Sequence, residues 1–203
     1  MTAKDPLKFD DTDFTLTKLI AAGVTGLTAV ISIVNPVIAW VSGDPFVTQL
    51  DGVDEAPASG GKPGVTLTHS PELTAEIADA GPGLWLASLA PSVLFVALLG
   101  LVVWLLWQLL DDVQAGRPFA AINVKRMRGI AMVIIVGAAL MFVVQGIVNG
   151  VMSQAALEGS TMFFSYDTSL SDLLLPGVGF LLAALAEAFR RGIELESEVE
   201  GLV

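Results

Sequence analysis

The sequence predicts an all-α membrane protein with four transmembrane helices, cytoplasmic N- and C-termini, and a small extracytoplasmic cap that contains short β-strands. Three observations lead to this prediction. Apolar residues make up 54% of the 203 residues and the mean hydropathy is +0.72, which is typical of a membrane protein. Four apolar stretches are each near the roughly 20 residues that a helix needs to cross a hydrocarbon core. The basic residues concentrate in every second connecting segment, as expected of segments that stay in the cytoplasm.

The apolar stretches divide the chain into tails, spans and loops. We expect a cytoplasmic N-terminal tail at 1–18, a span at 19–39, an extracytoplasmic loop or cap at 40–83, a span at 84–110, a basic cytoplasmic loop at 111–128, a span at 129–152, an extracytoplasmic loop at 153–172, a span at 173–189 and an acidic cytoplasmic tail at 190–203. The first tail holds four aspartates and lacks the short basic start of a secretory signal. The first span is therefore expected to be a retained signal anchor.

The orientation follows from the distribution of Lys and Arg. Nine of the ten basic residues lie in the three segments expected in the cytoplasm, whereas the first outer loop holds only Lys62 and the second holds none. Because basic residues beside membrane spans stay preferentially in the cytoplasm, the three loops and both tails agree on one topology.

The first outer loop is too long for a simple turn, and we expect it to fold. Residues 47–50 and 65–68 alternate as short strands do, and 161–166 of the second outer loop are expected to add a third strand. Serine followed by proline predicts the start of a short helix at 70–79. Because an isolated hairpin is marginally stable in water, a cap that shares strands from both loops is the more stable arrangement.

Small and polar residues inside the spans predict how the helices associate. Ala22 and Gly26 on the first span, like Gly146 and Gly150 on the third, are four residues apart and permit close helix packing. A polar stripe on the first span either makes hydrogen bonds between helices or lines a small cavity; it consists of Thr25, Thr28, Ser32 and Asn35.

Composition excludes several classes of function. The chain has no cysteine and a single histidine, His69, which rules out disulfides, a thiolate nucleophile and a histidine-rich metal site. A net charge of −11 argues against direct nucleic-acid binding, because phosphates must be neutralised by clustered cations. Neither a histidine-glutamate metal pattern nor a base for a serine nucleophile is found, so we expect no enzyme activity, no metal and no cofactor.

Two segments of the expected cytoplasmic face carry the candidate functional residues. In the basic loop, glycine and proline predict a turn, the asparagine is expected to cap the following helix, and Phe119 and Ile122 are expected to dock on the inner membrane face. In the fourth span, an interfacial ion pair of the glutamate with the two following arginines is favoured over a proton relay. The residues expected to dock a cytoplasmic partner or to contact lipid are Gly116, Pro118, Phe119, Asn123, Arg126, Arg128, Glu187, Arg190 and Arg191.

These segments resemble the four-span bacterial membrane proteins grouped as domain of unknown function 2975. The pattern of that family is a glycine, then proline-phenylalanine, an asparagine, and arginine-leucine-arginine before the third span. The chain departs from it mildly, with Met127 for the leucine and Ala131 for a common glycine; the family's closing segment is matched by Glu187, Phe189, Arg190, Gly192 and Leu195. The resemblance implies a multi-pass protein of the bacterial cytoplasmic (inner) membrane without an established activity, often encoded beside small helix-turn-helix regulators.

Two functions remain open on the sequence. The first is a non-enzymatic sensor, anchor or regulatory partner that acts through its cytoplasmic loop and tail. The alternative is a small transporter or a membrane protein that binds a lipid or another hydrophobic ligand. The expected partners are the lipid bilayer and a cytoplasmic protein such as a helix-turn-helix regulator, and homo-oligomerisation stays open. The arginines themselves either dock a partner or hold the topology and bind anionic headgroups, each worth about 1 kcal/mol near the surface.

Overall fold

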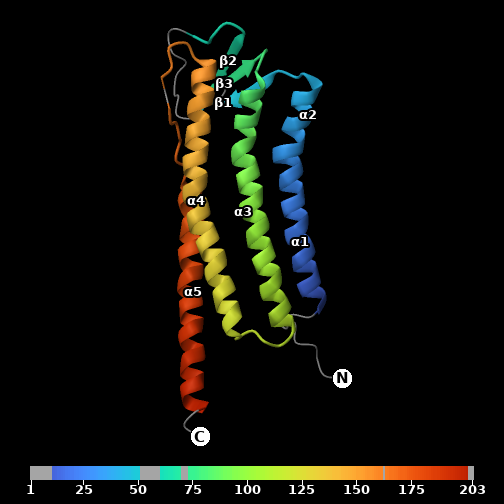
Figure 1. Ribbon diagram of the computed structural model, residues 1–203, viewed down its shortest axis with the longest axis vertical. Coiled ribbons are helices and arrows are strands. Elements are labelled where there is room, and N and C mark those ends of the chain that lie inside the picture. The colour runs from blue at the N-terminus through green and yellow to red at the C-terminus, as the bar shows by residue number, and fades with distance from the viewer. Residues whose placement is uncertain (1–10, 51–59, 70–72, 162, 201–203) are drawn as a thin grey trace. The chain divides into compact units, whose positions relative to one another are not determined.

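The computed structural model describes residues 11–50, 60–69, 73–161 and 163–200, which are mostly helical with one small sheet (Figure 1). The elements in order are α1 (Asp11–Ala29), the π-helical turn η1 (Val30–Val34), α2 (Asn35–Ser42), β1 (Phe46–Gln49), β2 (Val65–His69), β3 (Leu73–Ile77), α3 (Pro82–Gln114), α4 (Ala121–Ala156) and α5 (Leu170–Glu200).

Four helical segments are long and apolar enough to cross a membrane. They are Asp11–Ser42, Pro82–Gln114, Ala121–Ala156 and Asp172–Leu195. Each contains one of the four predicted spans and extends beyond it. This confirms the prediction of four membrane-span-like helices.

The first of these segments is interrupted by the π-helical turn η1. The backbone N–H of Asn35 bonds to the carbonyl of Val30, five residues back. Pro36 follows directly; it has no N–H to donate, and its ring would clash with the carbonyl four residues earlier, so the helix widens at this point. Of the polar stripe predicted on this segment, Thr25 donates its hydroxyl to the carbonyl of Ala21 in its own helix, not to a neighbouring helix.

The contacts divide the chain into two compact units, which are described separately. We call residues 28–97 and 137–173 the sheet unit, and residues 1–27, 98–136 and 174–203 the charged unit.

The sheet unit contains an antiparallel sheet with the order β1-β3-β2 (Figure 1). Ile77 of β3 lies opposite Phe46 of β1 and Val65 of β2. Strands at 47–50 and 65–68 were predicted, and β1 and β2 confirm them within one residue. The helix predicted at 70–79 is wrong over the described residues, because Leu73–Ile77 form the central strand of the sheet.

The alternation of buried and more exposed residues explains why this segment is a strand and not the predicted helix. Leu73, Ala75 and Ile77 are buried, whereas Thr74 and Glu76 between them are not, which is the period of two of a half-buried strand. Residues 70–72, which carry the predicted helix start, lie outside the described residues. The strand predicted at 161–166 is also wrong, since the described part of that stretch is irregular. Among the described residues of the segment 153–172, Leu157 forms instead an isolated bridge with Gly61.

The buried face of the sheet packs on the ends of the neighbouring helices. Trp85 of α3 stacks on Trp40 with ring centroids 6.2 Å apart and meets the ring of Phe46 edge to face at 4.9 Å. The same apolar cluster contains Phe46, Leu50, Leu73, Ala75, Ile77, Trp85, Met152, Ala156 and Leu157.

Lys62, the one basic residue of the segment between α2 and α3, has a structural partner at the end of α4. Its backbone N–H bonds to the carbonyl of Ala156 at 2.9 Å, and its ammonium bonds to the carbonyl of Gln154 at 2.5 Å. Carbonyls in the last turn of a helix lack partners within the helix and attract cations. Lys62 therefore caps α4.

The glycines of the third span have a different role from the one predicted. A side chain at Gly150 would meet the backbone of Phe163 at 2.5 Å, and one at Gly146 would collide with the ring of Phe164. The loop after α4, not another helix, therefore lies against these glycines. A Cβ placed at Gly26 would meet no atom within 4 Å beyond the backbone of its own helix, so no other described helix approaches closely there. Close approach of two helices occurs in the charged unit, where a Cβ at Gly179 of α5 would lie 2.7 Å from Ile135 of α4.

Candidate functional site

The loop between α3 and α4 is fixed by backbone hydrogen bonds. Gly116 has a φ of 75°, the left-handed conformation that glycine adopts without strain. Its N–H bonds to the carbonyl of Val113 at 3.0 Å, and the N–H of Arg117 bonds to the carbonyl of Asp112 at 2.9 Å. This pair of bonds is the Schellman ending of a helix. The turn predicted around Gly116 and Pro118 is therefore present.

Asn123 connects this loop to the first turn of α4. Its amide nitrogen donates to the carbonyls of Arg117 and Pro118 at 3.0 and 3.4 Å, and its amide oxygen accepts from Arg126 at 3.0 Å. The helix begins at Ala121, so Asn123 lies inside the first turn. The prediction that Asn123 caps α4 is wrong, because its side chain donates to the loop carbonyls that precede the helix.

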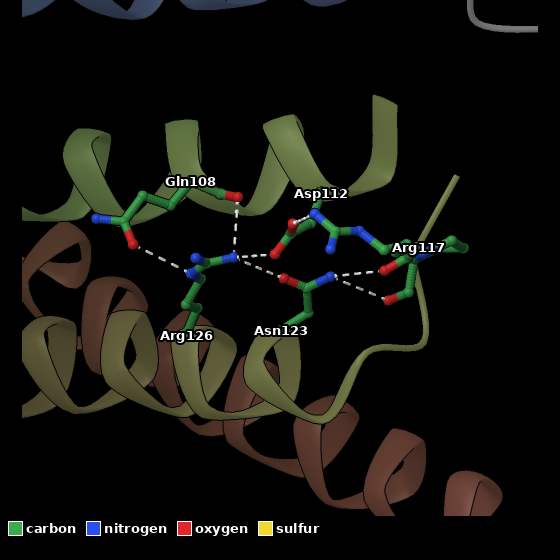
Figure 2. A network of polar contacts seen from close by, with 6 residues as sticks. Gln108, Asp112, Arg117, Asn123 and Arg126 are labelled. Carbon is green, nitrogen blue, oxygen red and sulfur yellow. Dashed lines mark hydrogen bonds and ion pairs between the residues drawn. The ribbon is translucent and has the colours of Figure 1, made fainter. Parts of the chain in front are cut away.

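Arg126 is the centre of a polar network between α3 and α4 (Figure 2). Its guanidinium donates to the side chain of Gln108 at 3.2 Å, to the backbone carbonyl of Gln108 at 3.0 Å, and to the carboxylate of Asp112. Asp112 also pairs with Arg117 at 2.7 Å. The side chains of Arg126 and Asp112 are only 19% and 13% exposed. A charge pair this buried is stable only because further hydrogen bonds satisfy both partners.

A second ion-pair cluster joins α4 to α5 around Glu187. Its carboxylate accepts from Arg128 at 2.5 Å, from two nitrogens of Arg190 at 2.6 and 2.9 Å, and from Arg191 at 3.1 Å. Arg190 also bonds to Glu194. The two planar nitrogens of Arg190 match the two carboxylate oxygens, the bidentate geometry for which arginine is suited. The ion pairs predicted between Glu187 and the two following arginines are therefore present, with Arg128 as a further partner.

Polar contacts also join α1 to the end of α3. The ammonium of Lys18 lies 2.5 Å from the carboxylate of Asp111, and the amide of Gln114 donates to Asp11 at 3.1 Å. Both pairs are exposed, and exposed pairs of this kind contribute little individually. They nevertheless bring a third helix to the same loop.

An apolar groove lies beside the loop, and we call it the Phe119 groove. It consists of hollows of about 370 and 440 Å³ that meet at Phe119, Phe189 and Ile193. One extends between α3 and α4 to Leu109, and the other extends along α5 to Leu185. The rings of Phe119 and Phe189 are 6.1 Å apart, and Phe119 is 59% exposed. Phe119 therefore presents an exposed aromatic ring beside an apolar groove.

The structure separates the predicted site residues into two groups. Gly116, Pro118, Phe119, Asn123 and Arg126 belong to the loop and its network, whereas the Glu187 cluster holds Arg128, Arg190 and Arg191. The four arginines therefore do not share one set of partners. In the acidic tail, Glu194 pairs with Arg190, while the side chains of Glu196, Glu198 and Glu200 lie outside the described residues.

Asp112 and Gln108 are the partners that sequence reasoning missed. Both lie on α3, four residues apart, and therefore on one face of the helix. An acidic residue in the last turns of an apolar helix, directly before a basic loop, is the signal that would have identified Asp112. Among the described residues, no group of three or more His, Cys, Asp or Glu side chains is placed to hold a metal ion.

Comparisons with known proteins give one result. A family model described as protein of unknown function (DUF2975) matches residues 66–203, which is more than half of the chain and includes every candidate site residue. No curated protein and no solved structure matches the sequence.

Proposed function

Since the chain belongs to the DUF2975 family, whose function is unknown, we propose its role from the site: a non-enzymatic sensor, anchor or regulatory partner in a membrane. In this proposal, the Phe119 groove docks an apolar segment of a cytoplasmic protein, for which a helix-turn-helix regulator is the candidate. The bilayer surrounds the four apolar helices, and the loop and tail of the charged unit contact the partner.

The observation that carries the proposal is the exposure of Phe119 on a loop that is otherwise fixed. Positive charge alone would hold the topology, and it needs neither the Schellman turn at Gly116 nor the bonds from Asn123 to the loop carbonyls. Those bonds hold the loop in one conformation while 59% of Phe119 stays uncovered. Preorganised aromatic side chains are typical anchors of protein interfaces, because little conformational entropy is lost when they bind.

The proposal places the loop and both termini in the cytoplasm of a bacterium, with the sheet on the outer side of the inner membrane. The absence of cysteine makes this testable with single introduced thiols. Thr66→Cys on the sheet should react with an impermeant thiol reagent on whole cells, and Ala115→Cys beside the loop should react only after lysis. The opposite labelling pattern would reverse the orientation.

Docking is tested by co-purification with a small helix-turn-helix regulator, the candidate partner. Phe119→Ala should reduce retention of the regulator at least tenfold without changing membrane insertion, because it removes the ring at the centre of the groove. Ile122→Ala is the matched control, since Ile122 is a similarly exposed apolar residue of the same region that lies outside the groove. Equal retention by all three proteins would contradict docking at the groove.

The alternative is that the groove binds a small hydrophobic ligand, as a transporter or lipid-binding protein would. Volumes of about 370 and 440 Å³ fall within the range of small-molecule sites. Extraction and mass spectrometry of the purified protein distinguish the two functions. A stoichiometric apolar compound that is lost in Phe119→Ala would favour the alternative over docking.

A further inference from the structure

The basic residues of the charged unit differ in how many hydrogen bonds they donate and in how exposed their side chains are. Arg126 donates to three residues and is 19% exposed, so it belongs to the interior network. Arg128 and Arg191 each reach Glu187 through a single nitrogen, and their side chains are 48% and 71% exposed. The guanidiniums of Arg128 and Arg191 therefore keep donors that can bind a further anion.

These exposed cations gather on one face. Lys125 and Arg128 are three residues apart on α4, and Glu187, Arg190 and Arg191 follow one another at helical spacing on α5. The contact between Arg128 and Glu187 joins the two helices there. We call Lys125, Arg128, Arg190 and Arg191 the basic seam; its four cations face two carboxylates among the described side chains, those of Glu187 and Glu194.

The basic seam and the Phe119 groove occupy different faces of α5. The groove is lined by Leu185, Phe189 and Ile193, which recur every four residues. Glu187 and Arg191 are offset from them by two residues, which is about half a helical turn. A ligand at the seam therefore does not occupy the groove, and this inference is independent of docking there.

Exposed apolar side chains continue from the seam along the same helix faces. Met132 and Val136 follow Arg128 at intervals of four residues on α4, and Phe180 precedes Glu187 by seven on α5. All three are more than half exposed and lie in helices apolar enough to cross a membrane. A surface that passes from apolar side chains to exposed cations matches a molecule with an apolar chain and an anionic head.

We propose that the basic seam binds the headgroup of an anionic phospholipid. The guanidiniums of Arg128 and Arg191 and the ammonium of Lys125 contact its phosphate, while the acyl chains lie along Met132, Val136 and Phe180. Glu187 competes with the phosphate for the same arginines and limits the affinity. A soluble acidic protein would not use the apolar continuation, which is why the surface favours lipid.

The test is lipid binding to the full-length protein purified in detergent, measured by native mass spectrometry with phosphatidylglycerol and phosphatidylcholine. The wild type should bind phosphatidylglycerol in preference. Changing Lys125, Arg128 or Arg191 singly to glutamine should weaken this binding about fivefold. Changing all three to glutamine should weaken it roughly a hundredfold. Arg117→Gln is the matched control, because Arg117 is an exposed arginine outside the seam.

Two further variants separate charge recognition from a loss of folding. Replacing Arg128 and Arg191 by lysine should retain the preference for phosphatidylglycerol, and Glu187→Gln should strengthen it by freeing arginine donors. Equal binding of both lipids by the wild type, or an unchanged preference in the triple variant, would overturn the proposal. So would displacement of the lipid by inorganic phosphate at equal concentration, which would identify a free phosphate as the ligand, or by an acidic peptide.

Discussion

The sheet unit and the charged unit are held together by different interactions. In the sheet unit, nine buried side chains, Trp85 among them, form an apolar core, and the backbone of three strands is paired. In the charged unit, ion pairs join helices whose apolar side chains are largely exposed, and a buried asparagine connects the loop to α4. Burial from water stabilises a core of the first kind, whereas apolar helices in lipid gain little from touching one another. Polar bonds therefore specify the arrangement where the hydrophobic effect cannot.

The largest loss of stability is expected in the sheet unit, from Trp85→Ala. Trp85 is buried between Trp40 and Phe46, and deleting a buried aromatic side chain costs about 3–5 kcal/mol. Hydrogen exchange of β3 in nanodiscs should accelerate by roughly a hundredfold or more. Trp104→Ala is the matched control, because Trp104 is 56% exposed on an apolar helix of the charged unit. Similar exchange in the two variants would mean that the sheet does not depend on this core.

A smaller loss of stability is expected in the charged unit, from Arg126→Gln. The change leaves Asp112 with only the exposed Arg117 as a cation. Breaking a fully buried pair costs 3–5 kcal/mol, and since this pair is partly exposed we expect about 2–3 kcal/mol. Hydrogen exchange of the loop at 115–120 should report the loss, and the exchange of β3 should not.

Two variants sharpen that prediction. In a double-mutant cycle, Arg126→Gln combined with Asp112→Asn should cost less than the sum of the single changes, because the unpaired carboxylate is removed. Arg128→Gln should leave exchange of the loop unchanged, since Arg128 contacts Glu187 and not the loop. Strict additivity would show that the network of Arg126 does not hold the loop.

The difference between the units also explains which features the sequence could predict. The apolar stretches predicted the four long helices, because span length and composition are local properties. The strands at 47–50 and 65–68 followed from alternation in the same way. The helix at 70–79 was wrong because its serine-proline start outweighed the alternation of Leu73, Ala75 and Ile77, whose burial depends on strands distant in the sequence.

At the candidate site too, the sequence predicted residues within one segment but not their partners in distant segments. The motif pointed to Gly116, Asn123 and Arg126, and the structure brings these residues together. It could not identify Asp112 as the partner of Arg126, because that pairing depends on how α3 and α4 align, and alignment of two apolar helices leaves no periodic signal in the sequence. The groove likewise required Phe189 to lie beside Phe119, seventy residues earlier.

The smallest loss of stability is expected from alanine substitutions at Gly150 and Gly146, where the loop after α4 lies against that helix. A Cβ at Gly150 would meet the backbone of Phe163, which cannot move without displacing the loop, so Gly150→Ala should cost about 1–3 kcal/mol. At Gly146 the obstacle is the ring of Phe164, which is 44% exposed and can rotate away. Gly146→Ala should therefore cost less, and exchange of the Ser165 amide, bonded to the Gly146 carbonyl, measures both. If the two variants exchange equally, side-chain crowding rather than backbone contact holds the loop.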